Sequence, residues 1–242
     1  MCRHVAHLGR PVSLSELLLE PPCGLVRQSW APRRQRHGTV NADGFGVGWY
    51  APTRRTPARY RRTTPMWADA SLASFAPVVW STCVLAAVRS ATPGTPYDES
   101  ACAPFLLGDV LLSHNGAVPD VAAALGRLVP SSALAAVGST VDSAFVAALV
   151  GARLAAGDPL GTALAVTVRL VAARAPTARL NLLATDGRTI AATTWGDSLV
   201  VCIASGGVQV ASEPSDDGPG WQDVPDRRLV TATAESLDLE EL

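Results

Sequence analysis

"MCRHVAHLG" (residues 1–9) opens the chain and places a cysteine directly behind the initiator methionine. Apolar and polar residues alternate after Cys2, and this alternation predicts a β-strand. Three interpretations of Cys2 compete: a lipid or secretion signal, an inert buried thiol, or a nucleophile that is exposed when Met1 is removed. Under the third interpretation, the mature protein begins with a strand whose first residue carries a reactive group.

The residues after Cys2 argue against a signal segment. A secretory signal needs about 7 to 15 apolar residues behind a basic start, and Arg3, His4 and Arg10 interrupt any such run. Myristoylation requires glycine at the second position, and a lipoprotein cysteine follows an apolar segment. No later run reaches the roughly 18 apolar residues of a membrane span. We therefore expect a cytoplasmic protein that contacts no membrane.

The composition is that of a folded protein without a strong charge imbalance. Hydrophobic residues make up 48% of the 242 residues, charged residues make up 17%, and the formal net charge is -1. This charge balance gives no reason to expect a nucleic-acid partner. The number of cysteines is odd, and no two of them form a Cys-x-x-Cys pair. We therefore expect neither a disulfide framework nor a metal site.

The order of hydrophobic patterns predicts strands before and after a pair of helices. The predicted elements are a strand over 2–9, a helix within 13–20, an apolar strand within 77–92, a strand within 109–118, helices within 139–157 and 159–176, and a strand meander over 179–214. This order favours an α+β fold with a layered αββα architecture, built as one domain from residues 1–242. The acidic tail is expected to be a solvated end.

An N-terminal cysteine would combine a nucleophile and a base in one residue. A cysteine thiol has a pKa of about 8.5, and an α-amine has one of about 7.7 to 8.0. The amine can therefore take the thiol proton near neutral pH and return it to a leaving amine. The position of Cys2 is weak evidence when taken alone, because an inert thiol explains it as well.

Three further polar positions stand where a predicted strand ends or a predicted helix begins. Asn115 and Gly116 offer a carboxamide and a backbone N–H to a developing oxyanion, although the same pair also suits a tight turn. Arg89 ends an apolar strand, where its guanidinium can bind a carboxylate in bidentate fashion or form a surface ion pair. Asp142 lies at a helix start, where it can bind an α-ammonium group or act as a cap.

These positions together resemble the glutaminase domain of class II glutamine amidotransferases, in the superfamily of N-terminal nucleophile hydrolases. The resemblance spans nearly the whole chain and implies the four-layer αββα sandwich of that superfamily. It implies that Cys2 attacks a γ-glutamyl amide while Asn115 and Gly116 form the oxyanion hole. It also implies that Arg89 binds the glutamyl α-carboxylate and that Asp142 binds the α-amine. No metal and no organic cofactor is called for.

The same resemblance extends the expected binding site beyond these residues. In the family an Arg-x-Ala-Thr motif binds the α-carboxylate, and this chain has that motif from Arg89 to Thr92. We therefore expect Ser90 and Thr92 to bind substrate, together with His114, which precedes the expected oxyanion pair. Other members carry Trp and His where this chain has Ser90 and Pro93, so a strict preference for glutamine is not implied.

Longer stretches resemble one branch of the family, the γ-glutamyl hercynylcysteine sulfoxide amidohydrolases of the ergothioneine pathway. These stretches are "APRRQRHGTVNADGFGVGWY", "VLAAVRSAT", "LLSHNGAV", "STVDSA", "ATTWGDSL" and "ASEPSDDGPGWQDVPDR". The branch implies a small-molecule γ-glutamyl substrate and leaves the oligomeric state open. Because the chain ends soon after the meander, we expect water rather than a synthase domain as the acceptor. A stand-alone glutaminase subunit and a binding module that retains Met1 are the alternatives.

The leaving group of that branch carries a trimethylammonium cation, which an aromatic or acidic wall would suit. Four aromatic residues are candidates for this wall, and a place in the core is the alternative for each: Phe45, Trp49, Trp67 and Trp195. The basic loop at 31–38 holds Arg33, Arg34, Arg36 and His37. These side chains can face a substrate carboxylate or simply be solvated.

Overall fold

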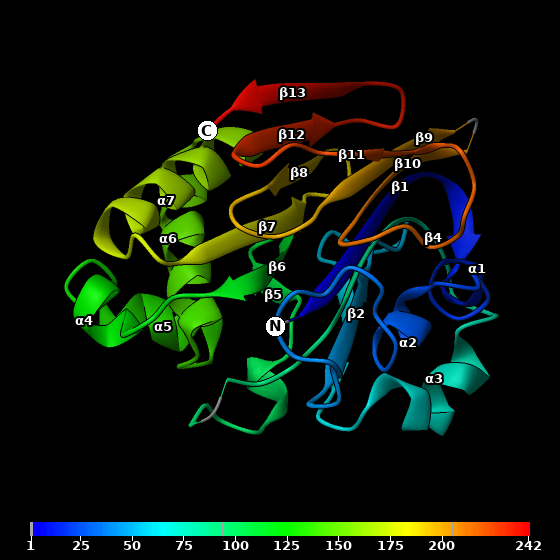
Figure 1. Cartoon of the computed structure of the whole chain (residues 1–242), viewed down its shortest axis with the longest axis horizontal. Coiled ribbons are helices and arrows are strands. Elements are labelled where there is room, and N and C mark those ends of the chain that lie inside the picture. The colour runs from blue at the N-terminus through cyan, green and yellow to red at the C-terminus, as the bar shows by residue number, and fades with distance from the viewer. Residues whose placement is uncertain (1, 93, 205) are drawn as a thin grey trace.

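The structure is a computed structural model that describes residues 2–92, 94–204 and 206–242. Two antiparallel sheets stack face to face, and helices cover the outer face of each (Figure 1). This arrangement confirms the expected four-layer αββα architecture. The expectations placed on Met1 and Pro93 lie outside the described residues.

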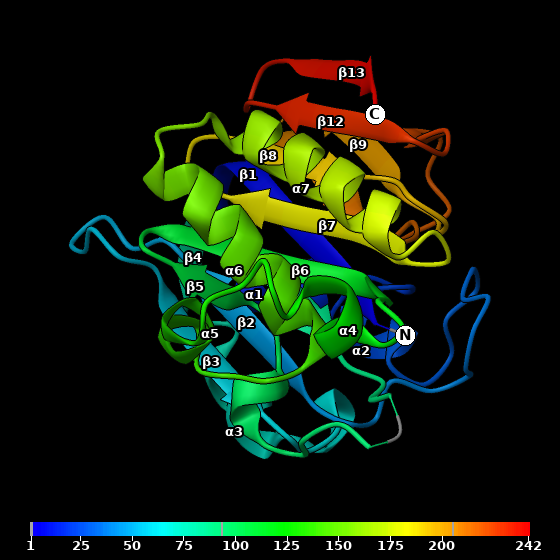
Figure 2. The same ribbon diagram turned by 90° about the vertical axis from the view of Figure 1, so that its left-hand side faces the viewer.

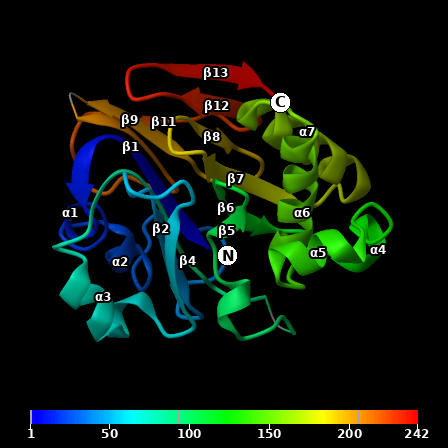
Figure 3. The same ribbon diagram turned by 180° about the vertical axis from the view of Figure 1, so that it is seen from behind.

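The larger sheet has the strand order β11-β9-β10-β1-β4-β2-β3 among the described residues. Its strands are β1 (Arg3–Ser13), β2 (Phe45–Trp49), β3 (Ala58–Arg62), β4 (Trp80–Val88), β9 (Val200–Ala204), β10 (Gly207–Ala211) and β11 (Trp221–Asp223). The helices on its outer face are α1 (Leu14–Leu18), α2 (Leu25–Gln28) and α3 (Ala70–Phe75), which Figure 3 shows from behind. A short 3-10 turn, η1 (Met66–Ala68), precedes α3.

The smaller sheet has the order β13-β12-β8-β7-β6-β5 in the described part of the chain. Its strands are β5 (Phe105–Leu107), β6 (Val110–Ala117), β7 (Arg179–Thr185), β8 (Ile190–Thr193), β12 (Arg228–Ala232) and β13 (Leu237–Glu241). The helices α6 (Asp142–Ala155) and α7 (Leu160–Arg174) cover its outer face, as Figure 2 shows. The remaining short helices are η2 (Glu99–Ala101), α4 (Val121–Leu125) and α5 (Ser131–Val137).

The hydrophobic core is divided into three clusters, one for each contact between layers. Ala6 and Leu85 of the larger sheet pack with Leu183 of the smaller sheet between the two sheets. A second cluster fills the space between the larger sheet and α1 to α3, and a third lies between the smaller sheet and α6 and α7. Both faces of the central strand β1 are therefore covered, so its alternation does not mark a solvated face, and its polar residues Arg3, His4 and His7 are buried as well.

The pairing of β1 with β4 places two of the expected site residues at the same end of the larger sheet. The two strands are antiparallel, and Arg3 lies opposite Val88. Cys2, which precedes Arg3, and Arg89, which follows Val88, therefore lie next to each other at that end of the sheet.

The pairing of β6 with β7 settles the structure of the Asn-Gly pair. Asn115 lies opposite Asn181 and Gly116 lies opposite Leu180 within this antiparallel ladder. The pair is therefore part of a paired strand, and the alternative of a tight turn is wrong.

The remaining local expectations are confirmed except at the C-terminal end. Ser13 caps α1 through a capping box with Glu16, and α6 begins at Asp142. The acidic tail is not an unpaired end, because Leu237–Glu241 pairs with β12 as strand β13. Its acidic side chains are nevertheless exposed.

No single helix in the described ranges is both long and apolar enough to cross a membrane, although α5 and α6, bent by 104°, pass together on length and composition.

Candidate active site

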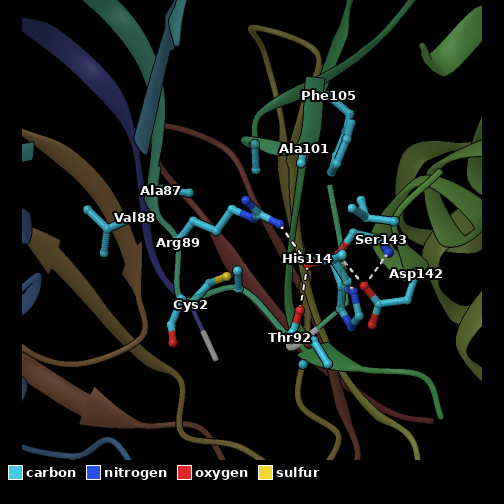
Figure 4. A pocket seen from close by; sticks show the side chains of 16 residues that line it. Cys2, Ala87, Val88, Arg89, Thr92, Ala101, Phe105, His114, Asp142 and Ser143 are labelled. Atoms are coloured by element: carbon cyan, nitrogen blue, oxygen red, sulfur yellow. Dashed lines mark hydrogen bonds between the residues drawn. The ribbon is translucent and has the colours of Figure 1, made fainter. Parts of the chain in front are cut away.

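A cavity lies where the ends of β1, β4 and β6 meet the start of α6. Figure 4 shows Cys2 and Arg89 on one side of it, with His114, Asp142 and Ser143 on the other. All of the expected site residues except Asn115 line this cavity, namely Cys2, Arg89, Ser90, Thr92, His114, Gly116 and Asp142. The roles that the sequence assigns to these residues stay predictions.

Asn115 lies directly behind Cys2. The backbone nitrogen of Cys2 donates a hydrogen bond to Oδ1 of Asn115 at 3.0 Å. This nitrogen becomes the α-amine if Met1 is removed. The bond fixes the carboxamide orientation, because an N–H donor requires the oxygen on its side. The other carboxamide atom, Nδ2, is buried and has no hydrogen-bond partner among the described residues. A buried donor in this state is ready to bind an anionic oxygen.

Gly116 is the residue that the strand geometry requires beside Asn115. A Cβ at this position would lie 1.9 Å from the carbonyl oxygen of Arg179 and 2.5 Å from Nε2 of His114. Any larger residue would therefore displace β7 or His114, and His114 lines the cavity.

Arg89 is a buried cation whose partners are neutral oxygens. It is 7% exposed, and its guanidinium donates to Oγ1 of Thr95 and the carbonyl of Pro96, each at 3.0 Å, and to the carbonyl of Asp43 at 3.4 Å. No carboxylate pairs with it within the described ranges. The alternative of a surface ion pair is therefore wrong, and the cation is available to a carboxylate ligand.

Asp43 is a residue that the sequence analysis missed. Its carboxylate accepts a hydrogen bond from the backbone nitrogen of Ala91 at 2.7 Å, and its carbonyl accepts from Arg89. Asp43 therefore fixes the backbone of the Arg-x-Ala-Thr motif. The signal in the sequence is the Gly44 that follows it, whose φ of 119° is a conformation that favours glycine.

The carboxylate of Asp142 is held in place by backbone donors at the opposite wall. Its Oδ2 accepts from the nitrogen of Val118 at 2.9 Å, and its Oδ1 accepts from the nitrogen of Ser143 at 2.8 Å. The Ser143 hydroxyl bonds to Nδ1 of His114 at 2.9 Å. Since the carbonyl of Arg179 can only accept, Nε2 of His114 carries a proton. His114 thus joins the oxyanion strand to the helix start.

Arg3 and Asp197 form a buried charged layer behind Cys2 that the sequence analysis also missed. The guanidinium of Arg3 donates from Nε to the carbonyl of Cys2 at 3.0 Å and from Nη1 to Oγ of Ser198 at 3.4 Å. Burial lowers the pKa of Arg3, while the negative charges of Asp197, Glu213 and the Cys2 sulfur act in the opposite direction.

The environment of Asp197 and His4 completes the electrostatics of the site. Burial raises the pKa of Asp197, and the nearby cations Arg3, Arg179, His37 and Arg36 partly offset this effect. His4 lies between the sheets, where burial and the charge of Arg3 lower its pKa to about 3. His4 is therefore neutral at physiological pH and is not a charged partner for the nucleophile.

The four aromatic candidates do not form a wall of this cavity. Phe45 is fully buried among core residues, and Trp49 packs against the same cluster. Trp67 stacks edge-on against Trp30, and Trp195 lies under the guanidinium of Arg227. The aromatic residue that does line the cavity is Phe105, which had no distinguishing signal in the sequence.

Comparison with known proteins agrees with this geometry. A family model for class II glutamine amidotransferases matches residues 22–206. The chain is 52% identical, over 95% of both chains, to the gamma-glutamyl-hercynylcysteine sulfoxide hydrolase of Mycolicibacterium smegmatis. It is 47% identical to the protein of the same name from Mycobacterium tuberculosis, over 100% of this chain and 97% of that one.

Solved structures share the fold at lower identity. A glutamine aminotransferase class-II domain protein from Silicibacter pomeroyi matches with a TM-score of 0.70 and 24% identity over 99% of both chains. An allosteric regulatory enzyme of purine biosynthesis matches with a TM-score of 0.69 and 15% identity, over 100% of this chain and 49% of that one. With the family match over most of the sequence and relatives 47% and 52% identical over nearly all of it, the chain belongs to the class II glutamine amidotransferases.

Proposed function

We propose that the protein hydrolyses the γ-glutamyl amide bond of γ-glutamyl hercynylcysteine sulfoxide, with glutamate and hercynylcysteine sulfoxide as products. Two relatives named for this hydrolysis, 52% and 47% identical to the chain, support the proposal. The observation that carries it is the cavity at Cys2, which presents the buried Arg89 cation and the Asp142 carboxylate on opposite walls. We also propose that residues 1–242 act as one domain.

A γ-glutamyl group has a charge pattern that complements this cavity. Its free end carries an α-carboxylate and an α-ammonium group, and its other end carries the scissile amide. Arg89 binds the carboxylate, since a guanidinium can donate two parallel hydrogen bonds to it. Asp142 binds the ammonium group, and Ser90, Thr92 and His114 complete the pocket. The amide carbon is thereby held at the sulfur of Cys2.

The first half of the reaction forms a thioester. Once Met1 is removed, the α-amine of Cys2 takes the thiol proton, and the sulfur attacks the γ-carbonyl carbon. The negative charge that develops on the carbonyl oxygen is stabilised by Nδ2 of Asn115 and the backbone N–H of Gly116. The α-ammonium group then returns its proton to the amide nitrogen, the C–N bond breaks, and the amine leaves.

The second half of the reaction releases glutamate. Water attacks the carbonyl carbon of the γ-glutamyl thioester, and the α-amine takes the proton of this water. The C–S bond breaks and the thiol is restored. Oδ1 of Asn115 keeps the amine beside the sulfur through both halves, since it accepts the hydrogen bond from the Cys2 nitrogen.

Replacing Asn115 with alanine should lower kcat by about 10²- to 10³-fold, the usual cost of losing one oxyanion donor. Steady-state kinetics on the γ-glutamyl substrate measure the effect. Ser113→Ala is the matched control, because Ser113 lies on the same strand, is buried and bonds to His4 instead of Cys2. Full activity in Asn115→Ala, or an equal loss in both variants, would contradict the oxyanion role.

The substrate assignment is tested by comparing glutamate release from γ-glutamyl hercynylcysteine sulfoxide and from glutamine. We expect kcat/KM to be higher for the conjugate by at least about 10-fold, a difference of roughly 1.4 kcal/mol in transition-state binding. A higher kcat/KM for glutamine would instead favour a glutaminase that supplies ammonia. Release of glutamate from neither compound would favour a binding module.

A further inference from the structure

A second cavity of about 450 Å³ lies beside the turn at 196–199 and is lined by Arg34, Arg36, Gly196, Asp197, Ser198, Leu199, Asp223, Val224 and Asp226. It shares no lining residue with the cavity at Cys2. The two cavities are nevertheless close, because Arg3 bonds to the Cys2 carbonyl with Nε and to Ser198 with Nη1. One guanidinium group therefore separates the wall of the second cavity from the main chain of Cys2.

The basic loop at 31–38 borders both cavities. Arg34 and Arg36 line the second cavity. At the far end of the loop, a Cβ on Gly38 would lie 3.8 Å from Oγ of Ser90, which lines the first cavity. The buried carboxylate of Glu213 fixes the start of the loop through hydrogen bonds from the backbone nitrogens of Arg33 and Arg34. The loop thus runs from one cavity to the other.

The arginines of this loop differ in their partners. Arg33 forms an ion pair with Asp217, and Arg34 forms one with Asp223. Arg36 has no ion pair and no hydrogen bond in the described part of the chain, and it is exposed at the cavity. Arg33 and Arg34 are exposed as the solvated loop predicts, but their guanidinium groups are engaged in ion pairs, whereas Arg36 keeps its donors free.

Asp197 lines the second cavity together with Arg36, and its carboxylate lies beneath the cavity surface. The side chain of Asp197 is fully buried, and neither of its oxygens accepts a hydrogen bond within the described ranges. Its ion-pair partner is Nε of Arg179 at 3.6 Å. Burial raises the pKa of Asp197, and the charges of Arg3, Arg179, His37 and Arg36 partly offset this effect. Asp197 therefore attracts Arg36 toward the cavity while making no bond that occupies the guanidinium donors.

The proposed chemistry requires a place for the amine side of the scissile bond. Arg89 and Asp142 hold the glutamyl end in the first cavity, so the other side of the amide extends past Cys2. When the leaving amine is an amino acid, the carbon bonded to its nitrogen carries a carboxylate. Ammonia, the leaving group of glutamine, carries none. A free guanidinium near the nucleophile can recognise this difference, because it binds carboxylates in a fixed, bidentate geometry.

We propose that the second cavity is the leaving-group subsite and that it takes amines that bear a carboxylate, with Arg36 as the carboxylate ligand. This inference rests on the proposed amidohydrolase function and adds the residue that separates γ-glutamyl amino acids from glutamine. Arg36 contacts the substrate in this scheme but takes no part in proton transfer.

Two substrates that differ in one carboxylate test the subsite: γ-glutamylglycine and γ-glutamyl methylamide. The wild-type protein is expected to show a kcat/KM at least about 10-fold higher for γ-glutamylglycine, since a charge-assisted bond of this kind changes rates by about 10- to 100-fold. Arg36→Gln should remove this preference and leave turnover of the methylamide unchanged. Arg55→Gln, which removes the same charge from an exposed loop elsewhere, should behave as wild type.

The outcomes separate the subsite from the function on which it rests. Equal kcat/KM values for the two substrates in wild type, or an unchanged preference in Arg36→Gln, would overturn the subsite while leaving the amidohydrolase intact. Equal losses on both substrates in Arg36→Gln would also overturn it, because they would show that Arg36 supports the structure of the loop and does not bind the carboxylate. A wild-type protein that hydrolysed neither substrate nor the conjugate would overturn the proposed function and the subsite together.

Discussion

Replacing Cys2 with alanine is expected to lower hydrolysis by about 10⁴- to 10⁶-fold, the range typical for loss of a covalent nucleophile. Alanine removes the sulfur but leaves the α-amine and the hydrogen bond to Asn115. Substrate affinity should therefore survive, since Arg89 and Asp142 are untouched. Steady-state kinetics and equilibrium binding of the γ-glutamyl substrate, measured on the same preparation, separate the two effects.

Cys2→Ser is the matched variant, because it keeps a nucleophile of similar size on the Cβ atom of the same residue. A hydroxyl is far less acidic than a thiol, so the α-amine removes its proton less readily, and we expect this variant to lie between wild type and alanine. Intact-mass measurement on each variant confirms that Met1 processing is unchanged. A full hydrolytic rate in either variant would rule out a covalent step at this residue.

Substitutions of the two charged residues in the first cavity should each lower kcat/KM by about 10²- to 10³-fold. Arg89→Met removes the cation and Asp142→Asn removes the carboxylate charge. Loss of one partner of a desolvated charge pair costs roughly 2 to 5 kcal/mol, and the expected 10²- to 10³-fold loss lies within the rate changes that this cost produces. KM on the γ-glutamyl substrate should rise more than kcat falls, because both residues bind the part of the substrate that does not react.

Substrates that lack one charged group show whether each effect comes from the assigned contact. 4-Aminobutanamide lacks the α-carboxylate, so the cost of Arg89→Met should disappear on it, whereas the cost of Asp142→Asn should remain. Glutaric acid monoamide lacks the α-amine and should give the reverse pattern. These two cycles also control for local damage, because a disturbed fold would lower activity on all three substrates. A cost of Arg89→Met that persisted on 4-aminobutanamide would refute its role as the carboxylate ligand.

The sequence was sufficient to predict the residues at the strand ends. The apolar runs before Arg89 and Asn115 identify buried strands; Arg89 directly follows β4, and Asn115 lies within the last three residues of β6. The pairing of Arg3 with Val88 then brings Cys2 and Arg89 together at one end of the larger sheet. These contacts follow from local patterns because each residue occupies the end of a regular element.

The charged layer behind Cys2 could not be predicted in the same way. Arg3 is fully buried, yet its neighbours Ser198, Asp197 and Glu213 lie about two hundred positions away in the sequence. A charged residue in an alternating strand usually indicates an exposed face, and only tertiary partners make its burial tolerable. The assignment of Arg36 likewise depends on Arg33 and Arg34 being paired, which the basic loop alone does not reveal.

The aromatic candidates failed for a related reason. Phe45 and Trp49 lie on β2, whose buried face packs against the helices of the larger sheet, so their large apolar surfaces are used in the core. Aromatic residues dominate core packing in general, and sequence alone does not distinguish a core ring from a ligand-binding one. Phe105 reaches the cavity because β5 begins beside it.

The central claim is that the freed amino terminus activates the sulfur on its own residue to form a γ-glutamyl thioester. The most direct test is intact-protein mass spectrometry on samples quenched with acid during turnover, followed by peptide mapping. The account predicts active protein that lacks Met1 and gains the mass of one glutamyl group on Cys2. Active protein that retained Met1, or an adduct on any other residue, would contradict it.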